Sequence, residues 1–427
     1  MAKKGRHRKG GRTTPKGTRP PGPRRPALKG SFLPDAPEPD LLDDVRDALT
    51  GNHPLALLEL ASSLLTVVDP REAVPFQPED ADPQPDRHEL LDALAGDDGL
   101  EATALLAAVA GLATDQVERR RLERAVARRD HQLPAWLGGL ARARASGVAQ
   151  LTHVLGDSDV VLLGARLPTG EELAAVICID HNVGTAVTDG LIRPGPIDDA
   201  LRQLIEIDDD LDASVTPLAP ADAKVRVIDA IATGAITYPR FETETWPACR
   251  PLVEWMASRL PDGGQAYQRP EWSEADCEAL TERFFASALG RSLDDADHRS
   301  LFDAILWFSC DYGPGDPLRW SPAAVEILLN GWIPRKIAAG PRYLSKAPAV
   351  LRAFIRFCHA ERAVPAHLTA RTVKAVDAAE PDYQRTIRTP RPQGPEALLA
   401  AVGALDPDGP WELPADDEDG DDDGVED

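Results

Sequence analysis

The chain has 427 residues, a formal net charge of −23, 43% hydrophobic residues and 27% charged residues. This length exceeds the usual size of one domain, and the composition is typical of a folded protein of two or three domains rather than of a wholly disordered chain. Only 5% of the residues are aromatic, so we expect helices that pack mainly through aliphatic side chains.

The five cysteines are widely separated, at positions 178, 249, 277, 310 and 358, and none belongs to a Cys-x-x-Cys pair. An odd number without paired spacing argues against a disulfide framework and against a cysteine-based zinc site. The longest mostly apolar run, residues 102–114, is too short to cross a bilayer, and no secretory signal follows the basic start. We therefore predict a cytoplasmic protein without membrane contact, cofactor or metal.

Charge is segregated along the chain. Residues 1–30 contain eleven Lys or Arg and no acid, whereas residues 406–427 contain twelve Asp or Glu and no base. Both ends have too little apolar content to offset the entropy of ordering. We predict a disordered basic arm over 1–38 and a disordered acidic tail over 396–427.

The first folded region, residues 39–146, has a helical pattern. Apolar residues recur at intervals of three and four in 41–49 and 53–68, as on the buried face of a helix. Further helices are predicted over 87–96, 101–113, 115–129 and 134–145. This region is therefore expected to form a helical domain.

The pattern changes at residue 147. Four runs rich in Val, Ile and Leu lie within 148–192 and are separated by short turn-forming segments (DS, PTG and HNV). This spacing predicts a four-stranded antiparallel meander. Two helices are expected to follow, near 197–207 and 221–233, which completes an α+β domain over 147–238.

From residue 239 to 395 the chain is predicted to be helical again. The expected helices are 246–260, 273–289, 294–310, 321–333, 347–362 and 368–380. The predicted fold class is thus α+β and mostly α-helical, with a central antiparallel meander between two helical regions and disordered, oppositely charged ends.

Two stretches of this last region, GDPLRWSPAAVEILLNGWIPRKI (315–337) and LRAFIRFCHAER (351–362), carry a resemblance. They resemble segments of uncharacterised proteins from high-GC actinobacteria, which form an orphan family without an assigned activity. The resemblance covers mainly residues 240–395. It implies a shared helical module and contributes no catalytic residues.

Sequence motifs for common chemistry are missing. GPGDPL (313–318) has Leu where a dinucleotide-binding loop needs its third Gly, and no strand is predicted before it. The chain contains no Gly-Lys-Ser/Thr, no Gly-x-Ser-x-Gly and no His-Glu-x-x-His.

The densest group of reactive side chains is CIDHN (178–182), in which Cys178, Asp180 and His181 stand at the end of a predicted strand. These three are the catalytic candidates. On a regular strand, Cys178 and Asp180 face one side and His181 the other, so a Cys–His pair requires a bulge. The alternative, which we favour, is that Asp180, His181 and Asn182 shape a hairpin turn.

Basic residues also concentrate near the C-terminus. Residues 333–392 contain twelve Lys or Arg and four acids, with Trp332, Tyr343 and Tyr383 as potential stacking groups. Such a patch suits a phosphate backbone, but it also suits the chain's own acidic segments. A helix-turn-helix over 369–388, with AEPDY as its turn, is a further alternative.

We expect a non-enzymatic adaptor whose basic arm and basic patch contact RNA or DNA nonspecifically, moderated by the acidic tail through arm–tail or patch–tail contact. The residues predicted to contact nucleic acid are Lys3, Lys4, Arg6, Arg8, Lys9, Arg12, Arg335, Lys336, Arg352 and Arg356. Two alternatives stay open. The first is a helical protein-interaction or structural protein with solubilising tails, and the second is an enzyme of unknown class that uses 178–182.

Overall fold

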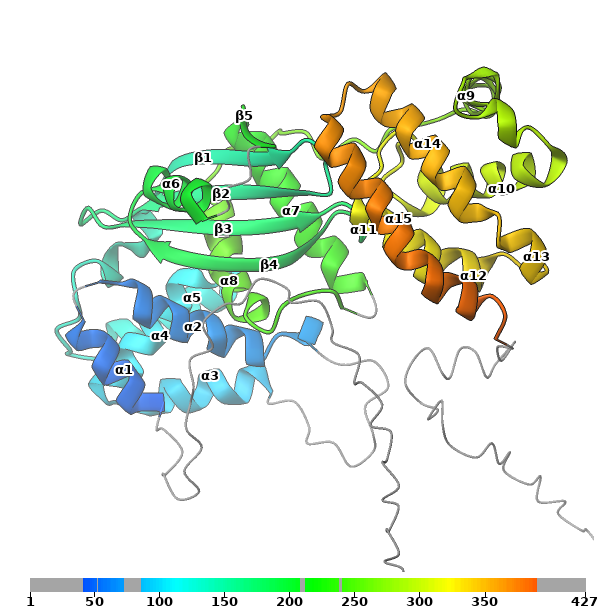
Figure 1. Ribbon diagram of the computed structural model, residues 1–427. Helices are drawn as coiled ribbons and strands as arrows, with labels where there is room; N and C mark the ends of the chain where they lie inside the picture. Colours follow the sequence, from blue (N-terminus) through cyan, green and yellow to red (C-terminus); the bar gives the residue numbers. More distant parts are fainter. Residues whose placement is uncertain (1–40, 52, 73–85, 208–211, 238–239, 390–427) are drawn as a thin grey trace, which may run out of the picture. The chain divides into compact units, whose positions relative to one another are not determined.

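The computed structural model describes residues 41–389, apart from residue 52 and residues 73–85, 208–211 and 238–239 (Figure 1). All described residues belong to one compact unit. They are mostly α-helical and contain a five-stranded antiparallel sheet, which confirms the predicted fold class. The predicted arm (1–38) and tail (396–427) lie outside the described residues. No described helix is long and apolar enough to cross a membrane.

The N-terminal helices agree closely with the sequence pattern. They are α1 (Leu41–Thr50), α2 (Leu55–Val67), α3 (Arg87–Gly96), α4 (Leu100–Leu112) and α5 (Gln116–Ala127), with a 3-10 turn η1 (Pro70–Glu72) after α2. Helix α4, which contains most of the apolar run 102–114, packs against α1, α2, α3 and α5. The carboxylates of Asp86 and Asp115 cap α3 and α5 by accepting hydrogen bonds from backbone amides in the first turn of each helix.

The predicted helix over 134–145 is wrong. A 3-10 turn η2 (Leu137–Arg142) occupies this position, and the first strand already begins at Arg144. Gly138 and Gly139 weaken a helix here because glycine loses the most backbone entropy on ordering. A side chain at position 139 would press against Pro168, since a Cβ there would lie 3.1 Å from the proline ring.

The sheet contains the predicted meander and one strand more. Strands β1 (Arg144–His153), β2 (Ser158–Arg166), β3 (Glu172–Asp180) and β4 (Ala186–Pro194) pair in sequence order, and β5 (Ala213–Thr216) pairs with β1, which gives the order β4-β3-β2-β1-β5. The prediction missed β5 because four residues carry too little periodicity. β5 is defined by its backbone pairing to β1.

Alternate residues of the central strands serve two cores, as the period of a strand requires. Leu162 and Val176 face α6 (Ile197–Ile207), whereas Val161 and Ile177 belong to the core that contains α7 (Pro220–Ile236) and α8 (Trp246–Ala257). Figure 1 shows α6 on one face of the sheet and α7 on the other. Gly190 of β4 is required where α8 approaches, because a Cβ at this position would lie 2.5 Å from the ring of Trp246.

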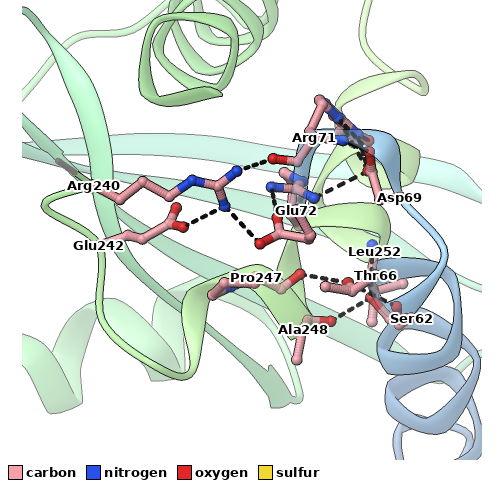
Figure 2. Close-up of polar contacts among 12 residues, drawn as sticks. Ser62, Thr66, Asp69, Arg71, Glu72, Arg240, Glu242, Pro247, Ala248 and Leu252 are labelled. Atoms are coloured by element: carbon pink, nitrogen blue, oxygen red, sulfur yellow. Dashed lines mark hydrogen bonds and ion pairs between the residues drawn. The ribbon is translucent and has the colours of Figure 1, made fainter. Parts of the chain in front are cut away.

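Helix α8 contains an internal proline, Pro251. Proline has no N–H, so the carbonyl of Pro247, one turn earlier, loses its helical donor. Thr66 of α2 replaces that donor, because its Oγ1 donates a 2.6 Å hydrogen bond to the Pro247 oxygen (Figure 2).

A second hydroxyl of α2 enters the next turn of α8. Ser62 Oγ donates to the Ala248 oxygen at 2.6 Å and accepts from the Leu252 amide at 3.2 Å. The serine thus bridges a carbonyl and an amide that a straight helix would pair directly. Two hydroxyls of α2 thereby compensate for the proline and hold α8 against α2.

Charged residues extend this junction beyond α2. The network consists of Asp69, Arg71, Glu72, Arg240, Glu242, Arg250 and Glu254. The Arg250 guanidinium is at its centre, 3.0 Å from Asp69 and 2.6 Å from Glu72, and only 3% of its side chain is exposed. Figure 2 shows Arg240 bridging Glu72 and Glu242, so η1 is fixed to the segment before α8 as well as to α8 itself.

The C-terminal helices surround a second core. They are α9 (Glu274–Ala286), α10 (Ala296–Trp307), α11 (Pro322–Glu326), α12 (Ile333–Lys336), α13 (Pro341–Leu344), α14 (Ala347–Glu361) and α15 (Ala366–Thr386), with a 3-10 turn η3 (Arg291–Leu293) and π-helical segments η4 (Phe308–Tyr312) and η5 (Ile327–Trp332). The two large cores divide the chain between Leu260 and Leu280. Helix α8 follows the predicted domain limit at 238/239, yet its buried residues belong to the first core. The described residues form one compact unit and are not divided into domains, so the domain limits stay a prediction.

The helix-turn-helix interpretation of 369–388 is wrong, because α15 runs without interruption through AEPDY. Pro381 lies inside this helix, but Val376, Ala379 and Tyr383 continue one buried face across it. The Tyr383 hydroxyl also donates to the Leu344 oxygen at 2.7 Å. Tertiary packing therefore overrides the helix-breaking tendency of the proline.

Candidate functional site

The three catalytic candidates of CIDHN do not form one group. Cys178 lies on β3 between Val160 and Asp189, and Asp180 accepts the amide of Asn182 in an Asx turn. Burial raises the pKa of the Cys178 thiol and of the Asp180 carboxyl. In the part of the chain that the structure describes, no hydrogen bond joins Cys178 to His181. The turn geometry agrees with the interpretation of 180–182 as a hairpin turn.

His181 instead contacts residues of other segments. Its Nε2 lies 3.2 Å from the Asp159 carboxylate of β2, and its Nδ1 lies 3.2 Å from Thr185 Oγ1. Because a carboxylate only accepts, Nε2 donates to Asp159, and Nδ1 and the Thr185 hydroxyl form the second hydrogen bond. Burial raises the pKa of Asp159, but hydrogen bonds from His181 and Thr152 outweigh burial, and the net pKa is below the ordinary value.

A chain of hydrogen bonds connects the His181–Asp159 pair to α7 through Thr152 and Gln150 of β1. Thr152 Oγ1 donates to Asp159 Oδ1 at 2.6 Å, and Gln150 Nε2 donates to Thr152 Oγ1 at 3.0 Å. Arg226 of α7 then donates to Gln150 Oε1 at 2.9 Å. Strands β1 and β2 and helix α7 thus hold His181 and Arg226 in fixed positions relative to each other.

Tyr267 lies between the two ends of this chain. The centre of its ring is 4.8 Å from the centre of the His181 ring in an edge-to-face arrangement, and the Arg226 guanidinium carbon lies 4.8 Å from the centre of the Tyr267 ring. Burial raises the pKa of the Tyr267 hydroxyl, and the nearby Asp159 carboxylate raises it further. The hydroxyl therefore stays protonated at neutral pH.

These residues surround a cavity of about 480 Å³. Its lining comes from β1, β2, the turn after β3, helix α7, residues 266–270 and residues 314–319. A volume of this size is in the range of cavities that hold small molecules. The lining includes three arginines and three aspartates: Arg226, Arg269, Arg319, Asp159, Asp229 and Asp316.

Thr185 in the cavity wall has an unusual backbone conformation, with φ at +64°. Branching at Cβ makes this left-handed conformation costly, by about 1–3 kcal/mol. In this conformation the threonine hydroxyl lies 3.2 Å from His181 Nδ1, in the tight turn between β3 and β4.

The predicted basic patch over 333–392 is partly neutralised by neighbouring acids. Arg352 pairs with Asp377 and Glu380, Lys346 with Asp297, Arg362 with Asp316, and Arg385 with Asp382. Arg335, Lys336 and Arg356 are exposed and form no ion pair with a described residue. Of the four predicted contacts in this region, Arg352 is therefore the one already held by carboxylates. The predicted contacts Lys3, Lys4, Arg6, Arg8, Lys9 and Arg12 lie outside the described residues.

The predicted stacking groups are largely inside the fold. Trp332 and Tyr383 are buried, and Tyr343 is half-buried with its hydroxyl on Ser300. Their rings therefore belong to the second core or its edge. Sequence proximity to basic residues did not distinguish core aromatics from exposed ones.

Two other aromatic rings are exposed, and one of them lies beside Lys336. Trp307 is 42% exposed and Tyr312 is 45% exposed, and their ring centres are 5.4 Å apart. The Lys336 ammonium lies 5.4 Å from the centre of the Tyr312 ring. We call Trp307, Tyr312, Arg335 and Lys336 the aromatic–basic surface. It forms where two π-helical segments end, and such segments are frequent at functional sites.

The sequence pointed to His181 and to Lys336 but missed most of their neighbours. Asp159, Arg226, Tyr267 and Arg319 are separated from His181 by 22 to 138 residues and share no motif with it. The one available signal for these neighbours was polar residues inside apolar β-runs, namely Gln150 and Thr152 in one run and Asp159 in the next. Comparisons of this chain with protein-family models, with curated proteins and with solved structures found no match.

Proposed function

We propose that the protein binds nucleic acid without sequence preference, through its basic arm together with the aromatic–basic surface. The observation that carries this proposal is the pair of exposed rings, Trp307 and Tyr312, with the Lys336 ammonium, unpaired among the described residues, over Tyr312. The exposed Arg335 is the neighbour of Lys336 in the chain. Bases stack on exposed rings, and nearby cations neutralise the phosphates between them.

The arm supplies most of the charge for this interaction. Its eleven basic residues within 1–30 face no acid in the same segment. Neutralisation of about 6–10 phosphates lowers affinity about 10³–10⁵-fold between 50 and 200 mM salt. The rest of the chain is acidic and repels a polyanion, so contact is restricted to the arm and to basic sites on the folded part.

The acidic tail moderates binding in this proposal. Its twelve carboxylates within 406–427 carry a charge similar in size and opposite in sign to that of the arm. Intramolecular pairing of such segments competes with a nucleic-acid phosphate chain. Loss of the tail therefore strengthens binding.

The test measures retention of labelled single-stranded RNA and DNA at 50 and 200 mM salt. It compares the intact protein with variants lacking residues 1–30 or 406–427. Binding that requires the arm, falls steeply with salt and increases without the tail supports the proposal. Absence of binding by every variant at low salt contradicts it and favours a protein-interaction role.

Point variants separate the aromatic–basic surface from general charge. Trp307→Ala is expected to weaken binding about 5- to 100-fold, because a stacked base contributes about 1–3 kcal/mol. Lys336→Ala is expected to weaken binding and to reduce the salt slope by about one, because one phosphate contact is lost. Arg352→Ala is the matched control, since its guanidinium is already held by Asp377 and Glu380. Equal losses in Arg352→Ala and Lys336→Ala would show that only total charge matters.

A further inference from the structure

Two oppositely charged side chains in the lining of the cavity beside His181 have no polar partner among the described residues. Arg319 and Asp229 both line it. Arg319 is half-buried and Asp229 is exposed, and no hydrogen bond or ion pair to either side chain is found among residues 41–389 outside the gaps. Each other charged group of the lining has at least one polar partner. Asp159 pairs with His181 and Asp316 with Arg362, while Arg226 donates to the Gln150 side chain and Arg269 to the Cys310 carbonyl.

Arg319 needs a hydrogen-bond partner more than Asp229 does, because Arg319 is half-buried and Asp229 is exposed. Its Nη2 is buried and has no hydrogen-bond acceptor within the described part of the chain. A buried guanidinium hydrogen without an acceptor is costly, and such groups in a native protein call for a partner. Carboxylates are the groups that match a guanidinium most closely, through two parallel N–H···O bonds.

The surroundings of Arg319 limit the charge of that partner. Four carboxylates, those of Asp157, Asp159, Asp180 and Asp316, act on the Arg319 guanidinium electrostatically, and none lies within ion-pairing distance of it. They oppose a multiply charged phosphate near Arg319, because like charges in a partly buried site repel strongly. A ligand with one negative group and no net negative charge avoids this repulsion.

Asp229 provides a negative charge in the same cavity, which a positively charged group of the ligand can contact. It lies on α7, one turn after Arg226, and its carboxylate is available to a cation. The volume of about 480 Å³ excludes a folded partner and accommodates a small molecule.

We propose that this cavity binds a small zwitterion of the α-amino-acid type, with its carboxylate on Arg319 and its ammonium group on Asp229. His181, Asp159, Thr152 and Arg226 of the hydrogen-bonded chain line the cavity, and Gln150 joins Thr152 to Arg226. This site is independent of the aromatic–basic surface, so either proposal stands or fails without the other.

The test uses the full-length protein. Its thermal unfolding is recorded with each of the free L-amino acids, with acetate, with ethylamine and with inorganic phosphate, and the strongest hit is measured by calorimetry. Ligand binding to the folded state raises Tm. At least one amino acid is expected to raise Tm more than acetate or ethylamine, since neither of these carries both charges.

Variants identify the two contacts. Arg319→Gln and Asp229→Asn are each expected to weaken the affinity for that amino acid about tenfold or more, the size of one charge-assisted interaction. Arg371→Gln and Asp130→Asn are controls, because both residues are exposed and outside the cavity lining. Asp229→Asn changes an exposed side chain, so it keeps the test decisive even if Arg319→Gln unfolds.

Three outcomes overturn the proposal. They are no amino acid raising Tm, unchanged affinity in Asp229→Asn, and phosphate raising Tm in place of amino acids. The last result would identify the cavity as an anion site that tolerates the surrounding carboxylates.

Discussion

The two large cores of this protein are built from different side chains. The first, which joins α1–α5, the sheet, α7 and α8, is filled mainly by Leu, Val, Ile and Ala. The second, among α9–α15, contains six of the nine phenylalanines of the chain: Phe284, Phe285, Phe302, Phe308, Phe354 and Phe357. A low overall aromatic content thus conceals a local concentration of rings.

The helices of the two cores are also held together by different kinds of contact. In the second core, rings contact one another directly, and Phe302 lies 4.8 Å from Phe284 and 4.7 Å from Phe354 between ring centres. In the first core, α8 is joined to α2 and η1 by hydroxyls and by the buried Arg250 network (Figure 2). The aliphatic core therefore depends on polar contacts at its boundary, whereas the aromatic core depends on ring packing in its interior. Substitutions in each core test this difference.

The largest effect is expected for Phe302→Ala. Phe302 is fully buried and contacts three other phenylalanine rings. Its truncation removes buried area and leaves a cavity, which lowers the free energy of unfolding by about 4 kcal/mol. Chemical denaturation gives this value, and Phe302→Leu, which retains most of the volume, is the control. A loss below about 1 kcal/mol in Phe302→Ala would contradict the central place of ring packing.

Arg250→Ala is expected to have the next largest effect. Removal of the guanidinium leaves Asp69 and Glu72 partly buried without their shared cation. Breaking such a pair on one side lowers the free energy of unfolding by about 3 kcal/mol, the lower end of the usual range, because Arg71 still pairs with Asp69 and Arg240 with Glu72. The control is Arg202→Ala, whose ion pair with Asp199 is exposed and contributes little. Similar losses in both variants would show that the buried network adds nothing specific.

Thr66→Val tests the compensation for Pro251. The substitution keeps the shape of the side chain and leaves the Pro247 carbonyl without its donor, which costs about 1–2 kcal/mol. Thr372→Val in the second core is the matched control. Thr372 is also buried, but its hydroxyl bonds to the carbonyl four residues earlier in its own helix, which already has a helical partner. Equal costs at both positions would refute a special role for Thr66.

The smallest effect is expected for His359, whose protonation changes the free energy of unfolding only when the pH falls. Burial lowers the pKa of its imidazole below 6.5, against the opposing hydrogen bond to the Trp320 carbonyl. Above about pH 6.5 both folded and unfolded states are neutral, and as pH falls below this value the unfolded state takes up the proton first. The contribution of His359 to stability is therefore present above about pH 6.5 and lost as pH falls.

Urea denaturation at several pH values measures this dependence. His359→Gln is expected to flatten the decline in the free energy of unfolding below pH 6.5, in addition to any constant change in stability. His88→Gln is the control, because this imidazole is exposed and forms no ion pair with a described residue. A pH profile of His359→Gln parallel to that of the unsubstituted protein would contradict the prediction.

Much of the fold follows from local patterns in the sequence. Periods of three to four residues predicted α2, α4, α10 and α14, and alternating runs with short turns predicted β1 to β4 in the correct order. Side-chain caps such as Asp86, Asp115 and Ser273 mark helix starts because the signal lies within one turn of the helix. The two errors have different causes. At 134–145 the helix-weakening preference of Gly138 and Gly139 outweighs the apolar pattern, whereas at Pro381 tertiary packing overrides the local preference.

For the two candidate sites, the difference between what the sequence determined and what the tertiary structure decided is larger. The sequence by itself determined that His181 follows a strand in a turn and that Arg335 and Lys336 belong to a basic segment. Only the tertiary structure decided that His181 contacts Asp159 and Tyr267 rather than Cys178, and that Lys336 lies over the exposed ring of Tyr312. Secondary structure arises from interactions over a few residues, which a single sequence displays. Sites such as this cavity arise from contacts between segments far apart in the chain, and those contacts exist only after the elements have packed.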